Sequence, residues 1–417
     1  MQTIHNPDSR FFRVSPAPFF SDAVDDLLIS QGVTSAAVTF WPFARRLVHS
    51  PFALGRSLAA FFGYLYIQDP SSMLPPLALN PPQGAVVLDM CASPGGKTGI
   101  ASQLVGPSGL VVANEPNHSR RATLQANILR QNLTNVVVSG YPAENIPLEG
   151  ENWPFILLDA PCSGWGTEKK HPLVKKLWTP EKVTPLVHLQ RQLLQKAGEL
   201  LAPGGRLVYS TCTTNLLENE EQVAWAVSHC GLEVESLSPF SGFVFDERAL
   251  ADGLLLVDSE CCQAQGFFIA CLRKPGLLAP AREKTCDLPG KLVELGGLLS
   301  CLPPGLEAGK GFVVNENVFF ASDKALSLLG SLRWQGYLLG RCKKDVFSPQ
   351  ARARCLISGT PGQEALVFEQ PHVLENILAG SSLSCTASSA HLPFYWKNLP
   401  LGWLRVKGRR CIWTGRA

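Results

Sequence analysis

Two cysteines, Cys162 in DAPCSGWG and Cys212 in YSTCTTN, are the side chains of this chain that are best placed for covalent chemistry. Each follows a short apolar run, 155–159 and 206–211, that indicates a buried parallel strand. The carboxyl ends of parallel strands meet at one edge of a sheet, and open α/β sheets bind ligands at that edge. We therefore expect both thiols beside a ligand site, where one can act as a nucleophile.

A third segment, LDMCASPGGKT at 88–98, indicates a strand, a glycine turn and the start of a helix. Backbone N–H groups and a helix N-terminus would then face a ligand. Glu115 ends the next expected strand, 20 residues after Gly95, where nucleotide-binding α/β folds place a carboxylate on ribose hydroxyls. This spacing favours a cofactor that carries adenosine.

The sequence of this turn allows two other interpretations. Gly96-Lys97-Thr98 resembles the end of a phosphate-binding loop, but that motif requires Gly where Cys91 stands. Taken alone, the Pro-Gly-Gly sequence is also compatible with a plain connection between a strand and a helix.

The elements that must position these residues alternate between strands and helices from 85 to 272, which predicts an α/β domain with a mostly parallel sheet. Strands are expected at 85–89, 110–114, 135–138, 155–159, 206–211, 232–237 and 267–272. Helices are expected at 97–104, 119–131, 188–201 and 219–228. Pro203-Gly204-Gly205 should end the third helix and turn the chain into the next strand.

Composition narrows the class of protein. Hydrophobic residues make up 46% of the chain and charged residues 17%, which is typical of a globular protein with a sizeable core. No run approaches 18 apolar residues, and an early Asp interrupts the N-terminus, so neither a membrane span nor a secretory signal is expected. The thirteen cysteines lack both a disulfide framework and metal-ligand spacing. We expect a cytoplasmic protein without a bound metal.

Charge is distributed unevenly along the chain. Residues 331–417 hold 12 Lys or Arg against 4 Asp or Glu, whereas residues 1–330 carry a net charge of −5. This asymmetry predicts an acidic partner for the C-terminal part. The expected organisation is an α+β appendage at 1–66, the α/β domain at 67–275, a linker rich in Pro, Gly and charge at 276–291, and a β-rich RNA-binding module at 292–417.

Taken together, several segments resemble the RNA cytosine-5 methyltransferase family, in its Sun or RsmF-like group. They occur in the order found in that family: QDPSSMLP (68–75), LDMCASPGGKT (88–98), ANE (113–115), LLDAPCSGWG (157–166), LVYSTCT (207–213), ENEEQV (218–223) and GFFIACLRK (266–274). The resemblance implies a Rossmann-like domain with a seven-stranded sheet whose last strand is antiparallel. It also implies S-adenosyl-L-methionine as the cofactor and a PUA-like module at the C-terminus.

The same resemblance assigns roles to individual residues. The methionine end of the cofactor falls to the backbone of Cys91, Ala92, Ser93, Pro94, Gly95, Gly96 and Lys97, with Glu115 at the ribose and Asp159 as a further carboxylate. Cys212 is assigned as the nucleophile that attacks cytosine C6, Cys162 as the group that assists release, and Lys97 as electrostatic help. Relatives hold the adenine with an Asp where this chain has Pro142, which leaves Glu144 as a substitute.

Three alternatives stay open at this stage. Cys162 could be the nucleophile, because a Pro-Cys turn serves that role in DNA cytosine-5 methyltransferases. The substrate could be transfer RNA instead of small-subunit ribosomal RNA, because both kinds of enzyme share the catalytic core. The chain could also be a non-catalytic RNA-binding scaffold derived from such an enzyme.

Contacts to RNA are expected from basic and aromatic residues in two regions. Near Cys162 they are Trp165, Lys169, Lys170, Lys175 and Lys176, whose other interpretation is a solvated basic loop. In the C-terminal module they are Arg341, Lys343, Lys344, Arg409 and Arg410. We expect the protein to act on RNA as a monomer.

Overall fold

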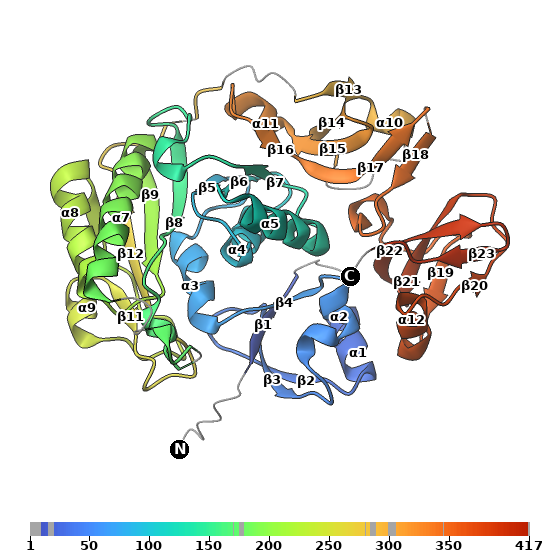
Figure 1. Ribbon diagram of the computed structural model, residues 1–417, viewed down its shortest axis with the longest axis horizontal. Helices are drawn as coiled ribbons and strands as arrows, with labels where there is room; N and C mark the ends of the chain where they lie inside the picture. Colours follow the sequence, from blue (N-terminus) through green and yellow to red (C-terminus); the bar gives the residue numbers. More distant parts are fainter. Residues whose placement is uncertain are drawn as a thin grey trace.

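A twisted central sheet with helices on both faces forms the body of the molecule (Figure 1). The computed structural model describes residues 10–15, 21–169, 171–174, 179–279, 281–283, 289–298, 306–344 and 346–415. The strands of the central sheet are β5 (Val86–Asp89), β6 (Leu110–Asn114), β7 (Val136–Ser139), β8 (Trp153–Asp159), β9 (Leu201–Thr211), β10 (Glu233–Glu235), β11 (Leu255–Val257), β12 (Phe267–Arg273) and β16 (Trp334–Gln335). Their order is β10-β12-β9-β8-β5-β6-β7-β16, with β11 also paired to β12.

The Rossmann-like core expected from the sequence is confirmed. Its parallel strands are β5 to β9, and β12 runs antiparallel to β9. The expected number of seven strands was wrong, because the sheet contains nine strands. The strand β11 pairs with β12 within the same domain, and β16 comes from the C-terminal part of the chain to pair with β7.

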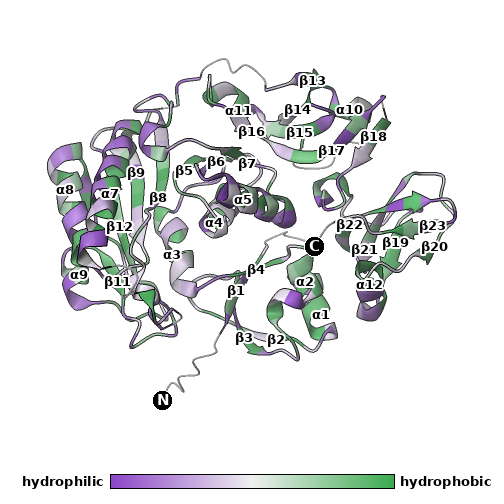
Figure 2. Ribbon diagram, viewed as in Figure 1, coloured by the Kyte–Doolittle hydropathy of each residue, from purple (hydrophilic) through white to green (hydrophobic). Residues whose placement is uncertain are grey.

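Alternating apolar residues cover the two faces of this sheet. Leu88 and Ile156 share one hydrophobic cluster with α7 and α8, whereas Val87 and Leu157 share another with α3, α4 and α5. Strands that are buried on both faces therefore read as continuous apolar runs. Figure 2 shows this hydrophobic character along the central strands. The helices of the domain are α3 (Pro70–Leu79), α4 (Gly96–Val105), α5 (His118–Gln131), α7 (Pro180–Leu200), α8 (Glu220–Cys230) and α9 (Glu247–Ala251).

Two local expectations differ from the structure. The helix expected at 188–201 is α7, which begins eight residues earlier and contains Pro185. The Pro203-Gly204-Gly205 sequence lies inside β9, where the pairing with β8 shifts register between Trp153 and Phe155. Gly204 has a φ of +75° there, so the three residues form a bulge in the strand and do not connect a helix to it.

The N-terminal part is a small α+β unit, as expected. It consists of β1 (Phe11–Val14), α1 (Ser21–Ser30), β2 (Thr34–Ala37), β3 (Ala44–His49), η1 (Leu54–Arg56), α2 (Leu58–Phe61) and β4 (Leu65–Ile67). Its four strands form a sheet in the order β2-β3-β1-β4. Its apolar residues, including Phe12 and Leu65, belong to a cluster that also contains Phe394 and Leu401 near the other end of the chain.

The C-terminal part contains two five-stranded sheets. The first is formed by β13 (Lys291–Val293), β14 (Gly309–Val314), β15 (Asn317–Ser322), β17 (Tyr337–Lys343) and β18 (Val346–Pro349), with α10 (Leu295–Leu298) and α11 (Asp323–Leu328). The second is formed by β19 (Leu366–Phe368), β20 (Leu383–Ser384), β21 (His391–Trp396), β22 (Leu399–Lys407) and β23 (Arg410–Ile412), with η5 (Arg354–Leu356) before it and α12 (Pro371–Leu378) within it. The first sheet packs beside β7, and the second packs against the N-terminal unit. Within the described residues, no helix is long and apolar enough to cross a membrane.

Candidate active site

The two cysteines lie together at the carboxyl edge of the sheet. Strand β8 ends at Asp159, three residues before Cys162, and β9 ends at Thr211, immediately before Cys212. The two strands are parallel neighbours in which Asp159 pairs with Ser210. The sulfur atoms of Cys162 and Cys212 are 3.3 Å apart, within hydrogen-bonding distance for sulfur. The sequence separates the thiols by 50 residues, and the sheet brings them into contact.

The two thiols differ in their electrostatic surroundings. The hydrogen bond from Cys162 lowers the pKa of Cys212, and the positive charge of Lys97 lowers it further, against the opposing effects of burial and Asp159. The hydrogen bond to Cys212 and burial raise the pKa of Cys162 well above its ordinary value. Cys212 is therefore the thiol that ionises more readily, and Cys162 is placed as its proton donor.

Asp159 and Lys97 form an ion pair at the same edge. The Lys97 ammonium lies 2.7 Å from Asp159 Oδ2 and also donates to Ser72 Oγ at 3.2 Å. Ser210 Oγ donates to the other oxygen, Asp159 Oδ1, at 2.9 Å. The Phe267 ring lies 4.8 Å from the ammonium. Four elements, α3, α4, β9 and β12, thus fix a carboxylate that remains 31% exposed at the edge of the sheet.

A buried carboxylate connects the two turns that carry Cys162 and Cys212. Glu218 is fully buried and accepts hydrogen bonds from Ser163 N (2.9 Å), Ser163 Oγ (2.5 Å), Gln190 Nε2 (3.0 Å) and Asn215 Nδ2 (3.1 Å). Ser163 Oγ also lies 2.8 Å from Thr213 Oγ1. Ser163 and Thr213 directly follow Cys162 and Cys212, so this network fixes the separation of the two turns.

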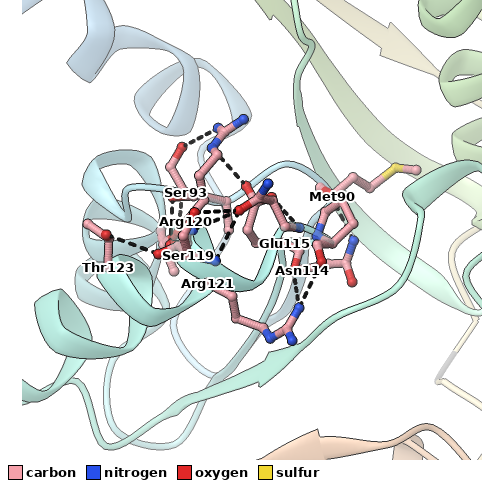
Figure 3. Close-up of polar contacts among 12 residues, drawn as sticks. Met90, Ser93, Asn114, Glu115, Ser119, Arg120, Arg121 and Thr123 are labelled. Atoms are coloured by element: carbon pink, nitrogen blue, oxygen red, sulfur yellow. Dashed lines mark hydrogen bonds and ion pairs between the residues drawn. The ribbon is translucent and has the colours of Figure 1, made fainter.

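The turn from Cys91 to Lys97 lies between β5 and α4, with Gly95 at the N-cap of α4 and a φ of +103°. It is supported by α5, because Asn127 Nδ2 donates to Pro94 O at 2.7 Å and Arg120 Nη2 donates to Ser93 O at 3.2 Å. Figure 3 shows Arg120 between Ser93 and Glu115. Burial raises the pKa of the Cys91 thiol well above its ordinary value, so Cys91 supplies backbone and no thiolate.

Glu115 lies beside this turn and is almost fully buried. Its Oε1 accepts from Asn117 N at 2.9 Å, and its Oε2 is 3.3 Å from Arg120 Nε (Figure 3). Neighbouring Asn114 donates to Met90 O and Tyr141 O, and its Oδ1 accepts from Tyr141 N. Asn114 thereby ties the ends of β5 and β6 to the loop after β7. That loop contains Pro142, which precedes η2 (Ala143–Asn145), and the half-buried Glu144.

The residues expected to contact RNA fall in three separate places. Trp165 begins η3 (Trp165–Thr167) beside the cysteines, and Lys169 is held by Ser259 O and by Glu260 at 3.5 Å. Lys170, Lys175 and Lys176 lie outside the described residues. Arg341 and Lys343 lie on β17, and Lys344 follows it. In the other C-terminal sheet, Arg409 lies in the turn between β22 and β23, and Arg410 is the first residue of β23.

Several site residues were not predicted. Ser72, Ser210 and Glu218 all lie in quoted motifs, yet their roles depend on contacts across the fold. Glu218, for example, follows Cys212 by six residues, and only the intervening turn brings it back beneath both thiols. The segment 213–222, TTNLLENEEQ, is mostly polar, so nothing in it marks Glu218 as a buried residue.

Known proteins resemble this chain over the same region. Residues 76–273 match the family model described as 16S rRNA methyltransferase RsmB/F. The ribosomal RNA small subunit methyltransferase F of Cronobacter sakazakii is 40% identical over 238 residues, which are 56% of this chain and 49% of that protein. A solved methyltransferase homologue from Pyrococcus horikoshii is 32% identical, with a TM-score of 0.54 over 64% of this chain and 86% of its own. Over residues 76–273 the chain is similar to the RsmB/F methyltransferase family.

The similarity to the RsmB/F family lies in the central domain. The matched region includes both cysteines, Lys97, Asp159 and Glu218. The chain spans about half the length of the curated relatives that it matches. NSun6 from Pyrococcus horikoshii, whose structure was solved with SFG, shares the fold at 22% identity and a TM-score of 0.57, over 64% of this chain and 91% of its own.

Proposed function

We propose that this protein is an S-adenosyl-L-methionine-dependent methyltransferase that methylates C5 of a cytidine in small-subunit ribosomal RNA. The observation that carries the proposal is the pair of thiols 3.3 Å apart, next to the Lys97–Asp159 ion pair. The match to the RsmB/F family model and the rRNA methyltransferase names of the relatives support the substrate. We further propose that the protein acts in the cytoplasm as a monomer.

The residues present fit the cofactor. The helix N-terminus and the backbone of the turn from Cys91 to Lys97 suit a carboxylate, and Glu115 suits ribose hydroxyls. Asp159 lies near the expected methionine end, and Glu144 remains our proposal for the adenine amino group. When bound, this cofactor supplies an electrophilic methyl group at the edge that carries the thiols.

The chain's own residues then account for activation of the base. The Cys212 thiolate attacks cytosine C6, and the electron pair of the C5–C6 double bond makes C5 nucleophilic. Negative charge develops toward N3, where Asp159 is assigned to donate a hydrogen bond. This donation requires Asp159 to take up a proton from solvent, while the Lys97 ammonium, 2.7 Å away, keeps its own.

Release follows once C5 carries the methyl group. A base removes the proton from C5, the C5–C6 double bond re-forms, and the bond between Cys212 sulfur and C6 breaks. The leaving thiolate needs a hydrogen-bond donor. Cys162 fits this role because its raised pKa keeps its proton in place, 3.3 Å from the sulfur of Cys212.

The assignment is tested by replacing each cysteine with Ser and incubating the variants with RNA that contains 5-fluorocytidine. Fluorine at C5 blocks release and therefore traps the adduct. We expect the unchanged protein and Cys162→Ser to form the adduct and Cys212→Ser to form none, as seen by a shift on denaturing gels. An adduct with Cys212→Ser but not with Cys162→Ser would reverse the two roles.

The other two candidates are separated by different measurements. Absence of S-adenosylmethionine binding in isothermal titration would favour a non-catalytic RNA-binding scaffold. Bisulfite sequencing of total RNA, from cells with and without the protein, distinguishes a ribosomal from a transfer RNA substrate.

A further inference from the structure

A cleft of about 950 Å³ opens between α5, the two C-terminal sheets and the end of the described chain. The C-terminal half of α5 forms one wall, β17 and β18 form a second, and β21 and β22 contribute His391 and Arg405. This volume is far larger than one phosphate group requires. The cleft is separate from the thiols, and none of the site residues described above except Asn127, Arg341 and Lys343 lines it.

Positive charge dominates the lining. Arg130, Arg341, Lys343, Arg352 and Arg405 face it, against Glu316 as the one carboxylate among its lining residues. Arg130 donates to the neutral side chain of Asn127, and Arg341 donates to that of Asn317. Within the described residues, the ion pairs do not include Arg130, Arg341, Lys343 or Arg405.

The cations of the cleft also act on their neighbours. Burial, followed by the charges of Arg354 and Arg130, lowers the pKa of Arg352 to about 10. Burial and then Arg405 lower the pKa of His391. These like charges destabilise one another, and an anionic occupant of the cleft would stabilise them.

The lining is mixed in character, as a polynucleotide backbone requires. Leu129, Leu338 and Pro349 offer apolar contacts for sugars between the cationic positions. The wall formed by α5 also connects the cleft to the cofactor turn, because Asn127 lines the cleft and donates to Pro94 O. The whole helix is roughly 20 Å long, so the cleft lies within a short reach of the site.

We propose that this cleft binds the phosphate backbone of the substrate RNA, beside the segment that enters the thiol site. The inference rests on the proposed function, and it assigns the contacts to Arg341, Lys343 and Arg405. It also separates these residues from Arg409 and Arg410, which do not line the cleft.

The test uses the full-length protein and small-subunit rRNA transcribed in vitro. In the triple variant Arg341→Ala/Lys343→Ala/Arg405→Ala, all three altered side chains are exposed, so a folded protein is expected. Each lost phosphate contact reduces the slope of log Kd against log salt by about 0.7 to 0.9, so the slope should fall by about 2 to 3. Affinity in moderate salt should fall on the order of tenfold or more.

One matched control removes three positive charges outside the cleft, and a second keeps the positive charges inside the cleft. Arg248→Ala/Arg273→Ala/Lys291→Ala neutralises three exposed cations outside the cleft and should leave the slope unchanged. Arg341→Lys/Arg405→Lys keeps the charge and should retain most of the salt dependence. Titration with S-adenosylmethionine reports on folding of every variant and should give the same affinity throughout.

The outcomes separate this inference from the proposed function. If the unchanged protein methylates the RNA and the triple variant binds it with the same slope, the cleft is not an RNA site. Loss of binding to assembled small subunits with undiminished binding to free rRNA would assign the cleft to a ribosomal protein and would also overturn the inference. If the unchanged protein neither binds nor methylates RNA, the proposed function itself fails.

Discussion

At the scale of residues, the site turns two chemically equal thiols into unequal partners. Burial and the shared hydrogen bond raise the pKa of Cys162, whereas that hydrogen bond and the charge of Lys97 lower the pKa of Cys212. Their shared hydrogen bond therefore places the proton on Cys162 and the developing negative charge on Cys212. The sequence motifs favour the same assignment, but the structure adds a physical reason for it.

This asymmetry predicts a change in pH dependence. The thiolate is the reactive form, so the rate of adduct formation should rise with pH through the pKa of Cys212, with a midpoint below that of an ordinary thiol. Cys162→Ala removes the largest cause of the lowered pKa, so the midpoint should move to higher pH and the rate at pH 7 should fall. Cys162→Ser keeps a donor and should shift the midpoint less.

Rapid-quench measurement of the adduct with 5-fluorocytidine RNA, from pH 6 to pH 10, provides the profiles. The rates of adduct formation of Cys162→Ala and of the unchanged protein should converge at alkaline pH, where Cys212 is ionised in both proteins. Identical midpoints for all three proteins would mean that Cys162 does not control the ionisation of Cys212.

At the scale of elements, the turns after β8 and β9 are held together by backbone contact as well as by Glu218. Gly166 N donates to Cys212 O at 3.0 Å, and Gly266 N donates to Gly166 O at 3.0 Å. A Cβ added at Gly166 would lie 2.2 Å from Gly266 O and 2.9 Å from Cys212 O. Only glycine fits between these two carbonyls, and this steric constraint explains why the second glycine of DAPCSGWG is a glycine.

Gly166→Ala is therefore expected to displace the Cys212 turn, at a cost of about 1–3 kcal/mol in folding free energy. Adduct formation should slow on the order of a hundredfold, because a misplacement near 1 Å has effects of that size. Gly362→Ala, at a position where an added Cβ meets nothing within 4 Å, is the matched control. Urea unfolding and adduct kinetics measure both effects, and normal kinetics in Gly166→Ala would refute the steric argument.

At the scale of the whole molecule, the three regions share hydrophobic cores. Trp334 belongs to the cluster on one face of the central sheet, and its ring packs edge-on against Phe312 at 5.6 Å. Arg354 donates to Arg130 O at 3.1 Å and lies 4.3 Å from the ring of Tyr64. The N-terminal unit, α5 and the C-terminal part are thus connected at one point.

Shared cores predict one cooperative thermal transition for the full chain. Trp334→Ala should lower the stability of the whole protein by about 3–5 kcal/mol, as expected for truncation of a buried aromatic residue. Gln335→Ala, which loses the exposed hydrogen bond with Gln125, should stay within about 0.5 kcal/mol. Two separate calorimetric peaks, with only one of them shifted by Trp334→Ala, would show that the regions unfold independently.

The sequence was sufficient for features that depend on local pattern. Apolar runs identified the core strands β5, β6, β7, β8, β9 and β12, and the rule for the carboxyl edge brought Cys162 and Cys212 together. Residues whose partners lie far along the chain could not be found in this way. Neither the pairing of Trp334 with Ser139 nor the contact of Glu218 with Ser163 has a periodic signal. Pro185 likewise obscured the start of α7.

The pairing of β16 with β7 also has a consequence for how the protein is made. About 195 residues of chain separate the end of β7 from its outer partner, so at 5–20 residues per second a ribosome needs about 10 to 40 s to deliver that partner. Throughout this interval the newly made sheet has an open edge, to which strands of other nascent chains can add. The time of synthesis, and any chaperone that shields β7 during it, therefore influences the yield of the finished protein.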